Sequence, residues 1–266
     1  MNLHPPYSPS DWKELQELLF HDAHNTTLDR IRSPYIYRGL SDITYELKTS
    51  LIRMGGLYLQ LEKHLLRNFK KYAYNAHPQG TSDWHWLALA QHHGLPTRLM
   101  DWTYSPYAAL HFATENIHRY DTDGVIWALN YERVNQYLPE RPKTIISQVG
   151  SNSFTGEMLL QAYPSLEALD QVEGDFVIIF ESASLDQRIV NQYALFSMMS
   201  TADGVLSEWL EQYPELYFRI RISKDLKWEI RDRLDQANIN ERVLFPGLQG
   251  LSKWLKRHYS PKNENS

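Results

Sequence analysis

Two kinds of hydrophobic pattern occupy different parts of this 266-residue sequence. In the first half, apolar residues recur at helical spacing: Leu57, Leu61 and Leu65 are four residues apart and share one helix face. In the second half, Val, Ile, Phe and Tyr gather in short runs, and residues 216–222 alternate between two sets of side chains as a half-buried strand does. This separation favours an α+β fold over alternating βαβ units.

Start and stop signals bound further helices. Residues that can cap a first helical turn precede several of the apolar segments, and glycine or proline follows them. We therefore expect helices that begin near Asp11, after Ser82, after Ser105 with Pro106 in the first helical position, and after Ser223, and a last basic helix around residues 253–257. Alanines 108, 109 and 113 leave the helix that begins at Pro106 small enough on one side for close packing against a sheet or a neighbouring helix.

The strand-like runs predict one sheet. They cover residues 33–39, 124–129, 175–181, 193–199 and 216–222. We expect a single domain with a mixed or antiparallel sheet, formed mainly in the second half of the chain, and helices packed around it. Residues 1–30 are expected to be a helical extension packed on this domain, and residues 256–266 a loose C-terminal tail. A short turn is expected between the helix that ends near residue 91 and the helix that begins at Pro106.

Composition excludes several classes of function. The net charge is −5, with 27 Lys and Arg against 32 Asp and Glu, so we expect no general nucleic-acid binding. The longest apolar runs are too short to cross a membrane. The absence of cysteine removes disulfides, thiolate zinc sites and cysteine nucleophiles. Residues 1–10 carry no signal-peptide pattern, and a cytoplasmic location is expected.

The densest group of polar, turn and aromatic residues is the segment 91–106. Neighbouring helical residues point about 100° apart, so His92 and His93 cannot share one ion on a helix, and no third ligand follows at metal spacing. We expect no metal site. A purely structural interpretation stays open, in which Asp101 pairs with Arg98 or caps the helix that begins after Ser105, and His93 satisfies a turn.

These residues resemble the FRG domain family. The resemblance is carried by Tyr37-Arg38-Gly39, by the segment 91–103, by Ser105-Pro106, Ala109-Leu110 and Phe112-Ala113, and later by Arg188-Ile189, Gln192, Leu195-Phe196, residues 244–246 and residues 248–251. It covers roughly residues 31–255, which we expect to be the FRG domain. Tyr37 replaces the more usual phenylalanine. The family is named for three residues and not for an activity.

A second resemblance, to ADP-ribosyltransferase folds, implies an activity. Those folds place a His or Arg on an early strand to hold NAD, then a central motif that leads into an Ala- and Phe-containing helix, and then a late strand with a catalytic glutamate. Tyr37-Arg38-Gly39, residues 97–113 and residues 191–196 follow the same order. Gln192 stands where the glutamate is expected, and an amide cannot stabilise positive charge as a carboxylate does. Glu157, Glu173 and Glu181 are the candidates to supply the missing acid.

This resemblance implies a bound NAD that is consumed as a substrate, by transfer of ADP-ribose or by hydrolysis. The residues implied in catalysis are Arg38, Gln192 and His93, and those implied in binding NAD are Tyr37, Arg38, Gly39, His92, Thr97, Arg98, Asp101, Trp102 and Ser105. An arginine fork grips a pyrophosphate, and aromatic rings stack on nicotinamide. The partners implied are a small nucleotide ligand and a protein acceptor, in a bacterial defence or toxin system.

The alternative is a binding or sensing module without catalysis, which uses the same pocket for a nucleotide or a peptide. A structural role for Arg38 also stays open, as an internal ion pair with Asp101 or another acid. A spatial observation tests the functional interpretation: Arg38, the segment 97–105 and Gln192 must line one cleft.

Overall fold

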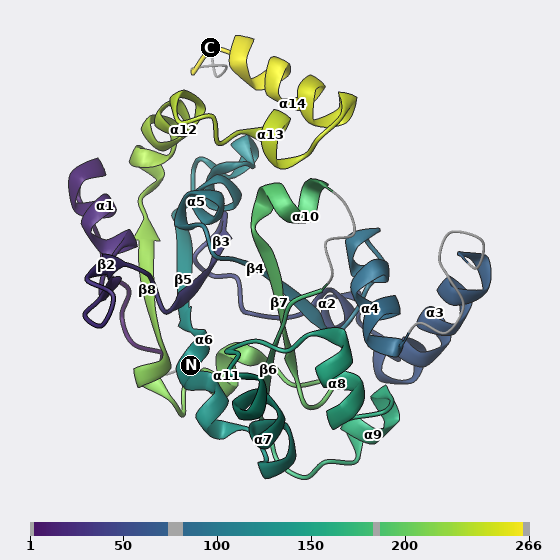
Figure 1. Ribbon diagram of the computed structural model, residues 1–266. Coiled ribbons are helices and arrows are strands. Elements are labelled where there is room, and N and C mark those ends of the chain that lie inside the picture. Colours follow the sequence, from purple (N-terminus) through teal and green to yellow (C-terminus); the bar gives the residue numbers. More distant parts are fainter. Residues whose placement is uncertain (1–2, 74–81, 183–186, 263–266) are drawn as a thin grey trace.

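A six-stranded antiparallel sheet is the main element of the computed structural model, which describes residues 3–73, 82–182 and 187–262 (Figure 1). Its strand order is β6-β7-β4-β3-β5-β8. The strands are β3 Tyr35–Leu40, β4 Leu99–Thr103, β5 Gly124–Asn130, β6 Val177–Phe180, β7 Ala194–Met199 and β8 Tyr217–Ile222, while β1 His24–Asn25 and β2 Arg30–Ile31 form a separate small pair. The fold is α+β, as expected, and its sheet is antiparallel.

Helices surround this sheet. Their bounds are α1 Trp12–Leu19, α2 Ser50–Met54, α3 Tyr58–Tyr72, α4 Asp83–His92, α5 Pro106–Thr114, α6 Tyr131–Val134, α7 Glu140–Val149, α8 Gly156–Ala162, α9 Leu166–Asp170, α10 Gln187–Gln192, α11 Leu206–Leu210, α12 Lys227–Gln236, α13 Glu241–Leu244 and α14 Leu248–Tyr259. The capping signals work as expected: Asp11, Ser82 and Ser105 accept hydrogen bonds from the first turns of α1, α4 and α5. None of the helices in the described ranges is long and apolar enough to cross a membrane.

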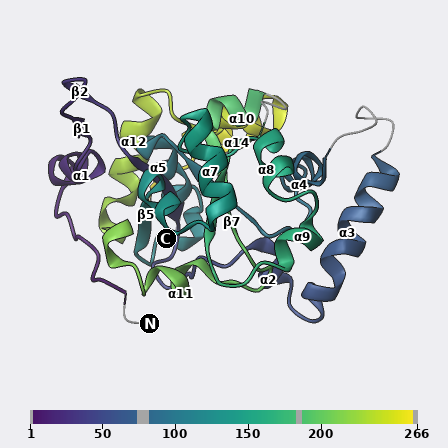
Figure 2. The same cartoon turned by 60° about the horizontal axis from the view of Figure 1, so that its bottom comes forward.

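Alternate residues of the strands enter different hydrophobic cores, as a pleated sheet requires. On one face, Tyr37 of β3 packs with α1, α5 and α12, and Leu99 of β4 packs with α4, α7, α8 and α9. On the other face, Ile36 and Trp102 belong to one cluster that continues across the sheet to α6 and α11. α1 thus packs on the sheet through Leu15 and Leu19, and α3 lies at the outer edge of the molecule in both views (Figure 2).

The prediction of a short turn between α4 and α5 is wrong. The segment that joins them contains β4, a central strand that pairs with β7 along its whole length, from Leu99–Met198 to Thr103–Ala194. Gly94 and Pro96 end α4 as expected, but the five residues that follow are too few to display a strand period in the sequence. Their strand conformation comes from pairing with a segment about a hundred residues away, which sequence patterns do not report.

Three further expectations need correction. The sheet is not formed mainly in the second half, because β3, β4 and β5 all lie in the first half. Helices are not concentrated in the first half either, because α6 to α9 lie between β5 and β6. Most of the helices α6 to α9 are too short to show a helical period in the sequence. In addition, α14 continues through Tyr259, past the start of the expected loose tail at residue 256, because buried Arg257 pairs with Asp235 and Glu241. Residues 263–266 lie outside the described residues.

Gly39 allows α5 to rest directly on β3. A Cβ at this position would lie 1.8 Å from the carbonyl oxygen of Ala109 and 2.7 Å from the amide nitrogen of Ala113. The alanine surface expected from the sequence therefore packs against backbone, with no room for a side chain between helix and strand. This close approach fixes the end of α5, and with it Phe112 and Glu115, beside the centre of the sheet.

A buried ionic network holds the three C-terminal helices. Glu241 of α13 accepts hydrogen bonds from Arg231 of α12 and from two nitrogens of Arg257 of α14, which also donates to Asp235. Burial alone would raise the pKa of Glu241, but the hydrogen bonds from Arg257 and the charge of Arg231 lower it to about 2. The carboxylate is therefore ionised and shared by both guanidinium groups.

Replacing Gly39 with alanine is expected to lower the free energy of unfolding by about 3 kcal/mol, because α5 must move away from β3. Urea denaturation followed by circular dichroism measures the change. Gly156→Ala is the control: nothing lies within 4 Å of a Cβ there, so its effect should stay within about 0.5 kcal/mol. Equal effects of the two substitutions would contradict the close packing.

Acid should weaken the C-terminal network over a defined range. The folded pKa of Glu241 is lowered from 4.5 to about 2, so its stabilisation is complete above pH 4.5 and is lost as the pH falls towards 2. At 1.36 kcal/mol per pH unit, the loss amounts to about 3 kcal/mol. Denaturation of the wild-type protein and of Glu241→Gln at pH 6, 4 and 3 measures it. The variant should start less stable and depend less on pH; an equal slope would contradict this assignment.

Candidate functional site

The sheet holds a cavity of about 690 Å³ at the place where β3 and β4 separate. β3 pairs with β5 along all six of its residues, but with β4 only at Tyr37–Thr103. The opening is lined from both sides of the sheet. One side, called the loop side, is the loop that follows β3, with Ser41, Thr44, Tyr45, Glu46 and Lys48, together with Arg53 of α2. The other side is formed by α5 with its C-cap, α10 and the strand ends, with Thr103, Phe112, Glu115, Arg188, Gln192 and Ala194. The volume is typical of small-molecule sites.

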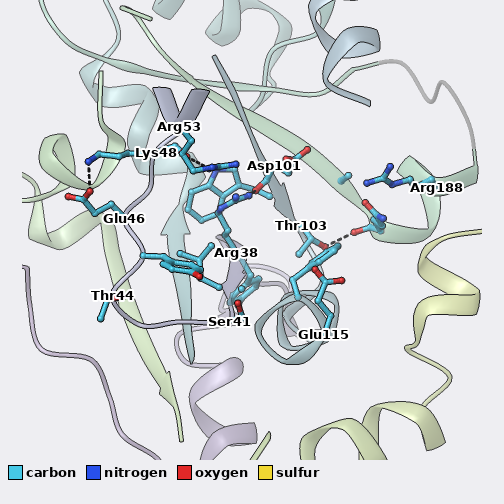
Figure 3. A pocket seen from close by; sticks show the side chains of 18 residues that line it. Arg38, Ser41, Thr44, Glu46, Lys48, Arg53, Asp101, Thr103, Glu115 and Arg188 are labelled. Atoms are coloured by element: carbon cyan, nitrogen blue, oxygen red, sulfur yellow. Dashed lines mark hydrogen bonds and ion pairs between the residues drawn. The ribbon is translucent and has the colours of Figure 1, made fainter. Parts of the chain in front are cut away.

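Arg38 lies between these two sides (Figure 3). Its Nη1 donates to the backbone carbonyl of Asp101 at 2.5 Å, and its Nε is buried without a hydrogen-bond partner. No carboxylate in the described residues lies within ion-pair distance of this guanidinium. Burial lowers the pKa of Arg38, the charge of Asp101 raises it and the charge of Arg53 lowers it. Because arginine keeps its proton in proteins, the group is a cation, and it lacks a neutralising contact within the described residues.

The internal ion pair left open for Arg38 does not form with the Asp101 carboxylate. That carboxylate accepts instead from Nε2 of Gln91 at 2.8 Å, and Gln91 Oε1 accepts from the hydroxyl of Thr97 at 2.6 Å. Asp101 also makes no pair with Arg98, and it does not cap α5, since Ser105 does. Gln91 thus holds the carboxylate of Asp101 in the cavity wall. The position of Gln91 at the start of the segment 91–106 did not predict this role.

The loop side of the cavity carries the positive charges of Lys48 and Arg53, and hydrogen bonds hold its backbone in place. Arg53 donates to the carbonyl of Lys48, and Lys48 pairs with Glu46. Asp42 accepts from the backbone and hydroxyl of Thr44, and these hydrogen bonds lower the pKa of Asp42. Buried Lys227 also donates to the carbonyl of Ser41 at 2.8 Å. Sequence reasoning missed Lys48 and Arg53, because nothing in residues 41–53 marks them beyond their charge.

The helix side brings Gln192 to the cavity, but not from a strand. Gln192 is the last residue of α10, and β7 begins only at Ala194. Its side-chain amide donates to the carbonyl of Leu244, while its backbone carbonyl accepts from the hydroxyl of Thr103 at 2.6 Å. The expectation of residues 191–196 as a continuous strand is therefore wrong, because Tyr193 adopts a positive φ of 50° that turns the chain between helix and strand.

Of the segment 97–105, only Asp101, Trp102 and Thr103 line the same cavity as Arg38 and Gln192, so the expected arrangement is found in part. Two aromatic residues of the wall are already engaged. The Tyr37 hydroxyl donates to Leu19 O, and burial raises its pKa to about 12, while Trp102 Nε1 donates to the hydroxyl of Ser197. Tyr37 and Trp102 are 0% and 2% exposed, so neither ring is free to stack on a ligand.

Five other expected residues do not line the cavity. His92 ends α4 and His93 caps it, with their rings 5.1 Å apart. Thr97 bonds to Gln91 and Ser105 caps α5. Arg98 is 2% exposed and forms a bidentate pair with Glu62 of α3 and a further pair with Asp170 of α9. Burial alone would lower its pKa, but Glu62 and Asp170 raise it.

The carboxylates of the cavity differ from those expected. Glu157, Glu173 and Glu181 are not among its lining residues, and Glu181 instead accepts from Tyr104 and Ser153. The acids that do line it are Glu46, Asp101 and Glu115. In the described part of the chain, no three or more side chains of metal-ligating type come together.

Comparison with known proteins identifies one part of the chain. The family model described as FRG domain matches residues 33–122. The matched segment runs from β3 to just before β5 and includes β4 and α5. No curated protein and no solved structure matches the chain.

Removal of the charge should destabilise the protein much more at Arg98 than at Arg38, both of which lie in the matched segment. Arg98→Met leaves Glu62 buried without its partner and should cost about 3–5 kcal/mol of unfolding free energy. Arg38→Met removes one hydrogen bond to a carbonyl but also a poorly solvated charge, and should cost about 1 kcal/mol. Denaturant titration of both variants measures the difference. A loss at Arg38 as large as that at Arg98 would mean that the fold itself requires the Arg38 charge.

Proposed function

Because this chain contains an FRG domain at residues 33–122, we propose a function for the cavity that the domain builds: it binds NAD as a substrate, for transfer or hydrolysis of its ADP-ribose group. Of the residues that line the cavity, only Arg188, Gln192 and Ala194 lie outside the matched segment. The cavity is thus largely a product of the family's own residues.

The observation that carries the proposal is the state of Arg38. Arg38 lines the cavity, its buried Nε has no hydrogen-bond partner, and no carboxylate of the described residues lies within ion-pair distance of its guanidinium. A guanidinium only donates hydrogen bonds and matches the oxygens of a phosphate or pyrophosphate. Arg53, which lines the same cavity and donates to a carbonyl, adds a second positive charge. An anion bound here would neutralise both.

The position of Arg38 supports an extended ligand. Cavity residues lie on both sides of it, with Thr44 on one side and Glu115 on the other (Figure 3). A dinucleotide has its pyrophosphate between two nucleosides, so a central arginine with space on either side suits that shape. A protein that consumes NAD also fits the bacterial defence or toxin setting expected from the sequence.

One observation favours the alternative, a module that binds the nucleotide without turnover. Gln192 carries no charge, and its amide is bonded to Leu244 at a helix end. It therefore does not supply the negative charge that stabilises an oxocarbenium-like transition state. Release of nicotinamide separates the two functions.

The wild-type protein is expected to bind NAD and to release nicotinamide from it, and Arg38→Met should weaken binding at least tenfold, because a charged hydrogen bond contributes about 1.5–3 kcal/mol. Calorimetric titration measures the affinity, and chromatography measures nicotinamide. Arg67→Met, on the exposed surface of α3 outside the cavity, is the matched control and should bind as the wild type does.

Each outcome has a definite meaning. Binding that depends on Arg38, without nicotinamide release, would identify the sensing module. Absence of NAD binding, in a protein with an unchanged melting temperature, would overturn the NAD proposal for both functions.

A further inference from the structure

His111 and Glu115 stand one helical turn apart on α5 and face a different environment from the rest of that helix. His111 is completely buried, and its Nε2 has no hydrogen-bond partner. The nearest carboxylate oxygen, Oε2 of Glu115, lies 3.7 Å away, slightly too far for a formed hydrogen bond. Glu115 itself lines the cavity beside Phe112, with its side chain 42% exposed.

The protonation of His111 follows from its other ring nitrogen. Nδ1 lies 2.8 Å from Nη1 of Arg231. A guanidinium can only donate, so Nδ1 must be the acceptor. Burial lowers the pKa of His111, which keeps the ring neutral, and its single ring proton is therefore on Nε2. That proton is directed toward the only carboxylate within ion-pair distance of Nε2 in the described structure, that of Glu115.

The C-terminal helices hold this tautomer in place. Arg231 is completely buried, and its Nη2 donates to Glu241 at 3.1 Å. Glu241 is in turn held by Arg257, which also pairs with Asp235. The ionic network that fastens α12, α13 and α14 therefore ends, through His111, at a carboxylate of the cavity.

The position of Glu115 at the end of α5 disfavours a carboxylate. Glu115 follows the last residue of α5 as the C-cap, where the helix dipole disfavours negative charge. Lys or Arg is the residue type that stabilises such a position. A carboxylate that breaks this local preference, faces a cavity and has a buried donor behind it is a candidate for ligand contact.

We propose that Glu115 is the carboxylate that contacts the bound nucleotide on the helix side of the cavity, and that buried His111 positions it through Nε2–H. Because an ionised carboxylate only accepts hydrogen bonds, the part of the ligand at Glu115 carries hydroxyl donors, as a ribose does. Arg38 and Arg53 hold the phosphates, and Glu115 holds the sugar. The inference rests on the proposed binding of a nucleotide.

The test compares a ligand with hydroxyl groups and one without. Glu115→Gln should weaken NAD binding about tenfold. Binding of inorganic pyrophosphate, which lacks hydroxyls, should stay unchanged or become slightly tighter, because a negative charge leaves the cavity. Arg38→Met should weaken both ligands. Glu132→Gln, an exposed carboxylate on α6 outside the cavity, is the matched control and should change neither affinity.

The role of His111 is tested by coupling. His111→Leu should weaken NAD binding as much as Glu115→Gln does, and the double variant should be no weaker than either single one. His111→Gln retains an acceptor for Arg231 and a donor for Glu115, so it should recover most of the affinity. Losses that add in the double variant would overturn the positioning role.

If a His111 variant does not fold, NMR of the histidine ring in the wild-type protein still tests the proposal. Nitrogen NMR of the ring-labelled protein should show His111 protonated at Nε2 and not at Nδ1, and the Nε2 signal should shift in Glu115→Gln. An Nδ1-protonated ring, or no shift, would overturn the positioning. Pyrophosphate binding that depends on Arg38, with unaltered NAD affinity in Glu115→Gln, overturns this inference alone. Failure of both ligands to bind overturns the proposed function as well.

Discussion

The contact between the Arg38 guanidinium and the carbonyl of Asp101 spans the centre of the sheet where its strands part. β3 and β4 are neighbours, yet they share one residue pair, Tyr37–Thr103. Beyond that pair, a side-chain donor from β3 serves the backbone of β4 in place of a strand partner. The sheet stays continuous while a cavity opens through it, and the same charged group that bridges the gap is left with an unpartnered Nε.

Arg98 and Arg257 differ from Arg38 in the partners of their guanidinium groups. Arg98 and Arg257 are enclosed by acids, and each fastens distant elements: α3 and α9 to the start of β4, and α14 to α12 and α13. Such pairs are costly to break because the surviving charge is left buried. Within the described residues, the Arg38 guanidinium bonds to a carbonyl and to no carboxylate. Among these three arginines, the partners separate the two that fasten the fold from the one that lines the cavity.

Part of the candidate site could be predicted from the sequence. Arg38, Asp101, Trp102 and Gln192 were expected at the site and line the cavity. Gly39 was also expected, but its physical role is the contact with the backbone of α5. His92, His93 and Arg98 share the polar segment with Asp101, yet they lie elsewhere, since the chain passes from α4 into β4 and successive side chains there point to different sides. Glu115, Lys48 and Arg53 were missed because an isolated charge in a sequence looks the same whether it faces water or a cavity.

The sequence alone determined the local elements: the caps of α1, α4 and α5, the apolar strand runs and the small residues of α5, because each depends on neighbours within a few positions. The α+β class was also predicted correctly, although the expected separation of helices and strands between the two halves of the chain is not found. Tertiary structure alone decided that residues 99–103 are a central strand, that Gln192 ends a helix, and which arginine is neutralised. Each of these depends on contacts between residues far apart in the chain, and a local sequence pattern carries no information about such contacts.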